Sequence, residues 1–348
     1  MRRILESSAR RLWHGKGGGL VGPVLTPFSL LYGAGVRIRN SLFDRGFLDI
    51  EEGGAPVISV GNLSVGGTGK TPVSRWFVER LQHRGRHPAL VTRGYGEDEI
   101  QLHRRWNPEV PVVVAPRRIE GVRRAVDQGA DVCVVDDGFQ HRQLKRDIDI
   151  VLVSARDPLP ARLLPRGPYR EPLGSLRRAD LILVTFHGTE GEGEALDRIH
   201  RVNQLNQAPP VMAFPFRAGR WVTLSGDAAS APDGPVLLVS SVARPETVAE
   251  LAQECGVEVG EALAFPDHHD YGPEDLEEIE RAAGGRNIVT TEKDAVKLSA
   301  HGHRLPPTIV LTLVADPDPG VVRIIDRTLE RVLEPEDSRS PSASGEDR

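Results

Sequence analysis

The chain has 348 residues, of which 39% are hydrophobic and 27% are charged. This composition is typical of a folded protein with enough apolar side chains for a core, and the length favours about two domains. The two cysteines, Cys133 and Cys255, exclude a disulfide scaffold and a four-cysteine zinc site. We interpret both as reduced residues, which fits a cytoplasmic location.

The net charge of −5 is unevenly distributed along the chain. Residues 1–50 carry eight basic and three acidic side chains, whereas the other 298 residues carry 36 basic and 46 acidic ones. We therefore expect no nucleic-acid partner, although the basic N-terminal arm suits an anionic surface. No run of about 18 apolar residues is present, so we expect no ordinary transmembrane helix, and a signal peptide fits poorly.

Residues 1–48 form an arm that is both basic and apolar. Within it, residues 27–43 have the periodicity of an amphipathic helix. The apolar stripe of that helix consists of Phe28, Leu31, Gly35, Ile38 and Leu42. Such a helix either lies on an anionic membrane or packs on the core of the protein, and periodicity alone favours packing.

From residue 56 onward, short β-rich runs alternate with helical stretches. This alternation predicts an α/β fold with a mainly parallel sheet and helices on both faces. The expected strands are 57–60, 89–92, 112–115, 132–135, 148–153 and 181–185, and the expected helices include 70–83 and 117–128.

The pattern changes near residue 209. Residues 211–214 and 221–224 predict two strands joined by a turn, and a second, smaller α/β unit follows. Its expected strands are 236–240, 257–265, 287–291 and 308–314, and its expected helices are 246–255, 273–283, a short one after 291, and 319–333. We thus predict an arm (1–48), a first α/β domain (49–208), a two-stranded linker (209–226), a second α/β domain (227–333) and a disordered tail (334–348).

A glycine-rich loop after the first expected strand has the sequence context of a P-loop. The glycines let backbone amides surround phosphate oxygens at the start of a helix. The candidate nucleotide-binding residues are Ser64, Val65, Gly66, Gly67, Thr68, Gly69, Lys70 and Thr71. Lys70 is expected to reach the terminal phosphates and Thr71 to bind Mg²⁺, although Ser64 stands where the usual pattern has glycine. The alternative is a glycine-rich turn that binds nothing.

A second acidic motif supports the P-loop interpretation. Residues 132–135 form an apolar run that ends in Asp136 and Asp137. A carboxylate at the carboxyl end of a parallel strand beside a P-loop is placed to bind Mg²⁺. By itself, an acidic residue at the end of a strand is often there only because the strand reaches solvent at that point.

Two classes of P-loop protein fit poorly. Partitioning-type ATPases carry an extra lysine before the paired glycines, and this chain has Val65 there. A GTPase needs an Asn-Lys-x-Asp segment, and the nearest match here has Glu292 in place of the asparagine.

Five longer motifs point to one family. Taken together, residues 60–72, 136–142, 163–172, 265–271 and 290–298 closely resemble the tetraacyldisaccharide 4′-kinases, over a span from about residue 27 to about 333. The resemblance implies transfer of the γ-phosphoryl group of ATP, with Mg²⁺, to the 4′-hydroxyl of a tetraacyldisaccharide 1-phosphate, which gives lipid IV-A. It also implies a two-domain protein bound peripherally to the cytoplasmic face of the inner membrane through an N-terminal amphipathic segment, with no obligate protein partner evident.

The same resemblance implies a catalytic pair. Asp98 aligns with the family's catalytic aspartate and His268 with its histidine partner, although Ile100 replaces a proline and the preceding loop is short. Matching positions in the motifs give further substrate-binding or supporting candidates: Arg93, Glu99, Gln140, His141, Arg170 and Glu171. The pair is expected to accept or orient the sugar hydroxyl.

Several alternatives remain open from the sequence. Residues 267–270 have the composition of a metal cluster, and Asp98 lies in an acidic run that solvent alone would explain. For the whole chain, the rival functions are a P-loop ATPase switch that regulates a membrane partner and a membrane-attached scaffold without chemistry.

Overall fold

The structure is a computed structural model that describes residue 13 and residues 21–94, 96–189, 191–205 and 209–333. The predicted disordered tail at 334–348 and most of the first 20 residues of the arm lie outside the described residues.

The described strands form one 11-stranded sheet in the order β3-β2-β4-β1-β5-β6-β7-β11-β10-β8-β9. The strands are β1 (Val57–Asn62), β2 (Pro88–Thr92), β3 (Val112–Val114), β4 (Val132–Asp136), β5 (Ile148–Ser154), β6 (Leu181–His187), β7 (Val211–Thr223), β8 (Val236–Ser240), β9 (Val259–Ala264), β10 (Ile288–Thr291) and β11 (Thr308–Ala315). Every neighbouring pair is parallel except β7 and β11. The predicted mainly parallel α/β sheet is therefore confirmed.

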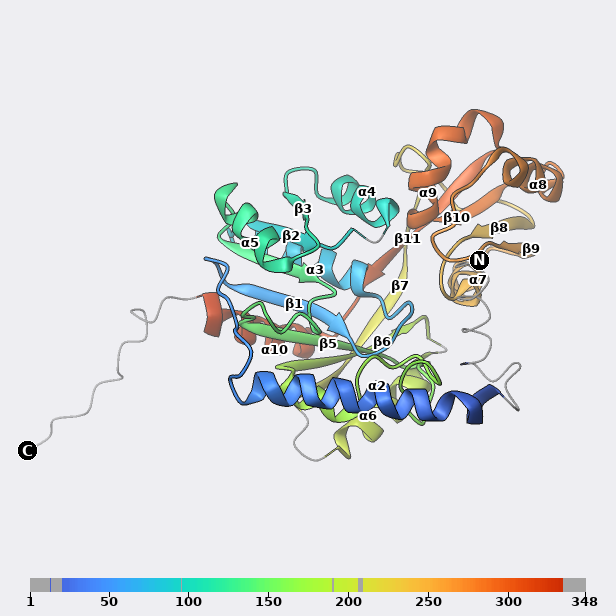
Figure 1. The fold of residues 1–348 in the computed structure, drawn as a ribbon. Coiled ribbons are helices and arrows are strands. Elements are labelled where there is room, and N and C mark those ends of the chain that lie inside the picture. Colours follow the sequence, from blue (N-terminus) through green and yellow to red (C-terminus); the bar gives the residue numbers. More distant parts are fainter. Residues whose placement is uncertain (1–12, 14–20, 95, 190, 206–208, 334–348) are drawn as a thin grey trace, which may run out of the picture.

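Helices cover both faces of this sheet (Figure 1). They are α2 (Val21–Asp44), α3 (Lys70–His83), α4 (Glu97–Trp106), α5 (Arg118–Asp127), α6 (Gly191–Asn203), α7 (Pro245–Glu254), α8 (Pro273–Ala283), α9 (Glu292–Leu298) and α10 (Pro319–Leu333). Strand β7 divides the sheet into a first group of strands, β1–β6, and a second group, β8–β11. Apolar residues of α3 and α10 share one core cluster with strands of the first group, whereas α5 belongs to a separate cluster. The fully buried runs of β1, β4 and β5 follow from this double cover.

The predicted linker of two strands is wrong, because residues 211–223 form the single long strand β7. Within this strand, Gly219 lies against β11, where an added Cβ would be 2.5 Å from Thr312 Oγ1. The pairing of β7 with β11 also shifts register between Leu311 and Leu313. Glycine here permits a close approach of two strands rather than a reversal of the chain.

Strand β7 sets the relative direction of the two groups of strands. Its first half pairs in parallel with β6, which ends with His187 beside Phe216. Its second half pairs antiparallel with β11, which ends with Ala315 beside the same Phe216. The strands on the two sides therefore run in opposite directions, and the carboxyl ends of both groups reach the same level of the sheet. Loops from both groups meet there.

The N-terminal helix is longer than predicted, because α2 starts at residue 21 and continues through Pro27. It runs along the lower side of the first group of strands in Figure 1. The predicted apolar stripe faces outward: Phe28 is 58% exposed, Leu31 72% and Ile38 62%. The preference from periodicity for packing this stripe on the core is thus wrong. Among the described residues, no helix has the length and apolarity needed to cross a bilayer.

Candidate active site

The P-loop joins β1 to α3 at the level where the two groups of strands meet. Gly69 caps α3 with φ 82°, a left-handed conformation that favours glycine. A Cβ on Gly69 would also lie 2.6 Å from the Phe216 ring. Asn62 Nδ2 donates to Thr68 Oγ1 at 2.7 Å, and Thr185 Oγ1 donates to the Thr68 carbonyl at 2.9 Å. The loop is therefore held by side chains of β1 and β6.

Ser64, the departure from the usual P-loop pattern, has a structural partner. Its hydroxyl donates to Asp157 Oδ2 at 2.9 Å. The other oxygen of Asp157 accepts from Arg244 Nη2 at 3.0 Å, and Arg244 follows β8 in the second group of strands. The hydroxyl that replaces glycine thus connects the P-loop to the far side of β7.

The two acids after β4 lie next to the P-loop lysine. Lys70 Nζ is 3.7 Å from Asp137 Oδ1, and Arg170 Nη1 is 2.9 Å from Asp137 Oδ2. Burial alone would raise the pKa of Asp137, but Lys70 and Arg170 lower it to about 2. For Asp136 the opposite holds, because burial and the nearby carboxylate of Glu99 raise its pKa. The carboxyl end of β4 therefore presents two buried carboxyl groups, and the charge of Asp137 is partly balanced by Lys70 and Arg170.

The donor set at this edge fits Mg²⁺. Thr71 opens the first turn of α3, and Asp136 and Asp137 supply carboxylate oxygens, the ligand type that Mg²⁺ prefers. The side-chain carbonyl of Asn62 is buried beside the loop without a hydrogen-bond partner. Within the described ranges, no group of three or more His, Cys, Asp or Glu side chains forms a metal cage by itself.

Some of the supporting candidates contact residues beside Asp136 and Asp137, and the others lie further out. Gln140 Nε2 donates to the main-chain carbonyl of Asn62 at 3.0 Å and to Glu171 Oε1 at 3.2 Å. Glu171 also accepts from Asn40 of α2 at 2.8 Å. His141 is half-buried, and burial, together with the charge of Arg118, lowers its pKa to about 4. Arg93 is exposed in the loop between β2 and α4.

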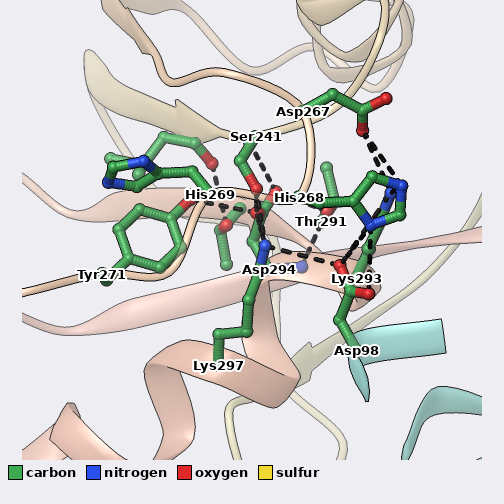
Figure 2. A network of polar contacts seen from close by, with 12 residues as sticks. Asp98, Ser241, Asp267, His268, His269, Tyr271, Thr291, Lys293, Asp294 and Lys297 are labelled. Carbon is green, nitrogen blue, oxygen red and sulfur yellow. Dashed lines mark hydrogen bonds and ion pairs between the residues drawn. The ribbon is translucent and has the colours of Figure 1, made fainter. Parts of the chain in front are cut away.

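Asp98 and His268 are in contact although 170 positions separate them in the sequence. His268 Nδ1 lies 3.1 Å from each carboxylate oxygen of Asp98 (Figure 2). Asp98 is buried in the first turn of α4. The alternative that Asp98 is only a solvent-exposed acid in a charged run is therefore wrong. Gly96 leaves room for the ring, because a Cβ there would be 2.8 Å from His268 Nδ1.

The backbone of His268 supports a specialised position. It has φ 58°, in the left-handed region that residues with side chains rarely adopt. Its neighbour His269 turns instead to Asp275, with 2.9 Å between Nε2 and Oδ2. The two histidines thus have different partners, and the hypothesis of a metal cluster at residues 267–270 is wrong for the described chain.

Charges around the pair determine its protonation. Burial would raise the pKa of Asp98, but the hydrogen bond from His268 and the nearby Lys293 lower it to about 2. The pKa of His268 is raised overall, because the effect of its hydrogen bond to Asp98 exceeds the lowering by burial and by Lys293. The pair therefore combines an ionised carboxylate with an imidazole whose basicity depends on its neighbours.

Several site residues were not singled out from the sequence. Asn62 and Lys293 lie at or just after carboxyl ends of strands, and Arg244 lies a few residues beyond one. The signal for Lys293 was its place in the charged run that follows β10. Nothing in the order of the residues places that run beside Asp98, because the contact depends on the reversal at β7.

Comparisons with known proteins identify the family. The sequence model described as tetraacyldisaccharide-1-P 4′-kinase matches residues 21–105 and 96–330. The chain belongs to this family. It is 38% identical over 321 residues to the tetraacyldisaccharide 4′-kinase of Anaeromyxobacter sp. strain K, an alignment that covers 81% of this chain and 83% of that one.

Another relative and one solved structure agree. The tetraacyldisaccharide 4′-kinase of Halorhodospira halophila is 39% identical over 300 residues, covering 80% of this chain and 84% of its own. The LpxK of Aquifex aeolicus, crystallised in complex with ATP, superposes with a TM-score of 0.72 and 27% identity, covering 90% of this chain and all of that one.

Proposed function

We propose that this chain transfers the γ-phosphoryl group of ATP to the 4′-hydroxyl of a tetraacyldisaccharide 1-phosphate, which forms lipid IV-A in lipid A biosynthesis. The observation that carries the proposal is the Asp98–His268 contact beside a P-loop and an acidic strand end. A nucleotide switch needs the loop and the acids, but it needs no contact between a buried carboxylate of the first group of strands and an imidazole from the second group.

The roles of the residues follow from the charges of the reaction. Backbone amides of residues 64–69 and the Lys70 ammonium bind the phosphates, and Thr71, Asp136 and Asp137 would hold Mg²⁺. When bound, that ion neutralises charge that develops between the β- and γ-phosphates. The Asp98–His268 pair takes the proton of the attacking hydroxyl as the hydroxyl oxygen bonds to the γ-phosphorus. The bond between that phosphorus and the bridging oxygen breaks, and ADP leaves with its electron pair.

The membrane is part of the proposal. The outward stripe of α2 presents apolar side chains to the surroundings, and the arm before it is basic. This combination suits peripheral attachment to an anionic surface, which we assign to the cytoplasmic face of the inner membrane. An acylated substrate anchored in that membrane then meets the site without leaving the lipid phase. We assign residues 49–208 to the P-loop kinase domain and 227–333 to the second domain, with β7 between them.

Incubation with labelled ATP, Mg²⁺ and tetraacyldisaccharide 1-phosphate in detergent tests the function directly. We expect a bis-phosphorylated product, and we expect Lys70→Ala, Asp98→Ala and His268→Ala each to lower turnover by about 10²- to 10⁴-fold without unfolding the protein. The readouts are product formation and circular dichroism.

Each rival function predicts a different result. A switch protein would hydrolyse ATP slowly and yield no phosphorylated sugar. A scaffold would yield no phosphorylated sugar, and its function in the cell would survive the Lys70→Ala substitution. Wild-type turnover of Asp98→Ala would remove Asp98 from the catalytic pair.

A further inference from the structure

The side chain of Lys293 lies against the side of His268 that Asp98 leaves open. Its ammonium is 3.1 Å from Asp267 Oδ1 and 3.3 Å from His268 Nε2. It is also 3.9 Å from Asp98 Oδ2 and 3.9 Å from Glu99 Oε1. Figure 2 shows the imidazole between the carboxylate on its Nδ1 side and this lysine. Lys293 therefore contacts both members of the pair.

A buried scaffold holds Lys293 in place. The next residue, Asp294, is fully buried and accepts from the Ser241 amide at 3.0 Å, from Tyr271 OH at 3.0 Å and from Thr291 Oγ1 at 2.8 Å. The preceding residue, Glu292, accepts from the Trp106 indole of α4 at 2.7 Å. The start of α9 is thus fixed to β8, to the loop that carries His268 and to α4.

The contact at Nε2 limits the state of the histidine. An ammonium group only donates hydrogen bonds, so it approaches Nε2 favourably when that nitrogen carries a lone pair. The ring proton then lies on Nδ1 and is donated to the Asp98 carboxylate. A protonated ring would instead direct an N–H at another cation.

We propose that Lys293 is a positioning residue that holds the Asp98–His268 pair in its proton-accepting form. This inference rests on the proposed function, which needs the pair to take a proton from the sugar hydroxyl. It adds a specific electrostatic role to a lysine that contacts the pair rather than the P-loop.

The charged groups that face the pair come from three segments. Asp98 and Glu99 lie on α4, Asp267 precedes His268 in its own loop, and Lys293 and Lys297 lie on α9. Lys293 lowers the pKa of Asp98 and also that of His268. Removing its charge raises both values, so the sign of the effect does not depend on which member finally takes the proton.

The pH profile of kcat/KM is the test, measured with ATP, Mg²⁺ and the disaccharide lipid. The acid limb reports protonation of the free enzyme's base. We expect Lys293→Met to shift the acid limb upward by about one pH unit, because a cation within about 4 Å is lost. Lys293→Arg should keep the limb near its wild-type position because it keeps the charge. Lys145→Met is the matched control, since Lys145 pairs with Glu52 on the surface.

A second measurement does not depend on turnover. In imidazole-labelled protein, the NMR titration of His268, assigned by its loss in His268→Gln, should move upward in Lys293→Met and stay in place in Lys145→Met. An unshifted His268 titration, together with equal acid limbs, would overturn the role of Lys293. A shifted titration in a protein without kinase activity would instead overturn the proposed function and leave the electrostatic role of Lys293 intact.

Discussion

Two non-glycine residues of the described chain, Asp137 and His268, adopt left-handed backbone conformations, with φ 55° and 58°. Each such conformation costs about 1–3 kcal/mol, so the surrounding structure must stabilise it. Asp137 is bound by Arg170, and His268 lies between Asp98 and Lys293. Local strain and candidate chemistry therefore coincide at both positions.

Gly69 provides a prediction at the residue scale. Gly69→Ala forces a Cβ into a left-handed backbone and against the buried Phe216 ring, so we expect a loss of about 3 kcal/mol in the free energy of unfolding and weaker ATP binding. Gly85→Ala is the matched control, because Gly85 has φ 71° with no atom near its added Cβ. It should cost about 1 kcal/mol. Urea denaturation and nucleotide titration measure both, and equal costs would refute the packing argument.

At the scale of one element, α2 has an unusual distribution of side chains. Its apolar stripe points outward, whereas its inner side makes polar contacts with the loops of the site. Tyr32 OH donates to the Arg170 carbonyl at 3.0 Å, and Asn40 donates to Glu171 at 2.8 Å. The helix is therefore attached through these hydrogen bonds and its buried Phe43, which leaves its outward apolar stripe for another surface.

Substitutions in that stripe test the surface. Leu31→Gln combined with Ile38→Gln should weaken binding to vesicles that contain anionic lipid by about tenfold or more, because each removes apolar area worth more than about 1 kcal/mol. The melting temperature should not change, since both side chains are exposed. Leu196→Gln, at an exposed position of α6, is the control. Unchanged co-sedimentation of the double variant would contradict membrane attachment through this stripe.

For the whole molecule, β7 unites two groups of strands into one sheet and brings their carboxyl edges together. The connection from Ser64 through Asp157 to Arg244 crosses the same junction. Gly67 and Ala243 also approach there, since a Cβ on Gly67 would be 3.0 Å from Ala243 Cβ. The P-loop is thus in contact with both groups of strands.

Breaking this connection should affect the molecule as a unit. Arg244→Met leaves the buried Asp157 carboxylate without its cation, so we expect the free energy of unfolding to fall by about 3 kcal/mol. Asp157→Asn in the Arg244→Met background should recover part of that loss. Urea denaturation followed by fluorescence and circular dichroism should give one coincident transition, because the sheet is continuous. Additive effects of the two substitutions would show that the ion pair contributes nothing.

Local sequence determined the parts whose contacts are close in the chain. Strand, loop and helix follow one another at residues 57–83, and the predicted helix 70–83 is confirmed because glycine before it and apolar periodicity within it define its ends. Asp136 was predictable for the same reason, since it directly ends a buried strand. Pairing of Asp98 with His268 was expected only through the resemblance to a family.

Tertiary structure decided what distant residues do to each other. No local pattern separates two strands joined by a turn from one long strand at residues 211–223, and only the antiparallel pairing of β7 with β11 sets the direction of the second group of strands. Periodicity likewise identified the apolar stripe of α2 but not the direction in which it faces. That direction is set by the polar contacts of the opposite side of the helix with other segments. The amino-acid order thus determined the elements and their chemistry, whereas long-range pairing across β7 determined which side chains meet.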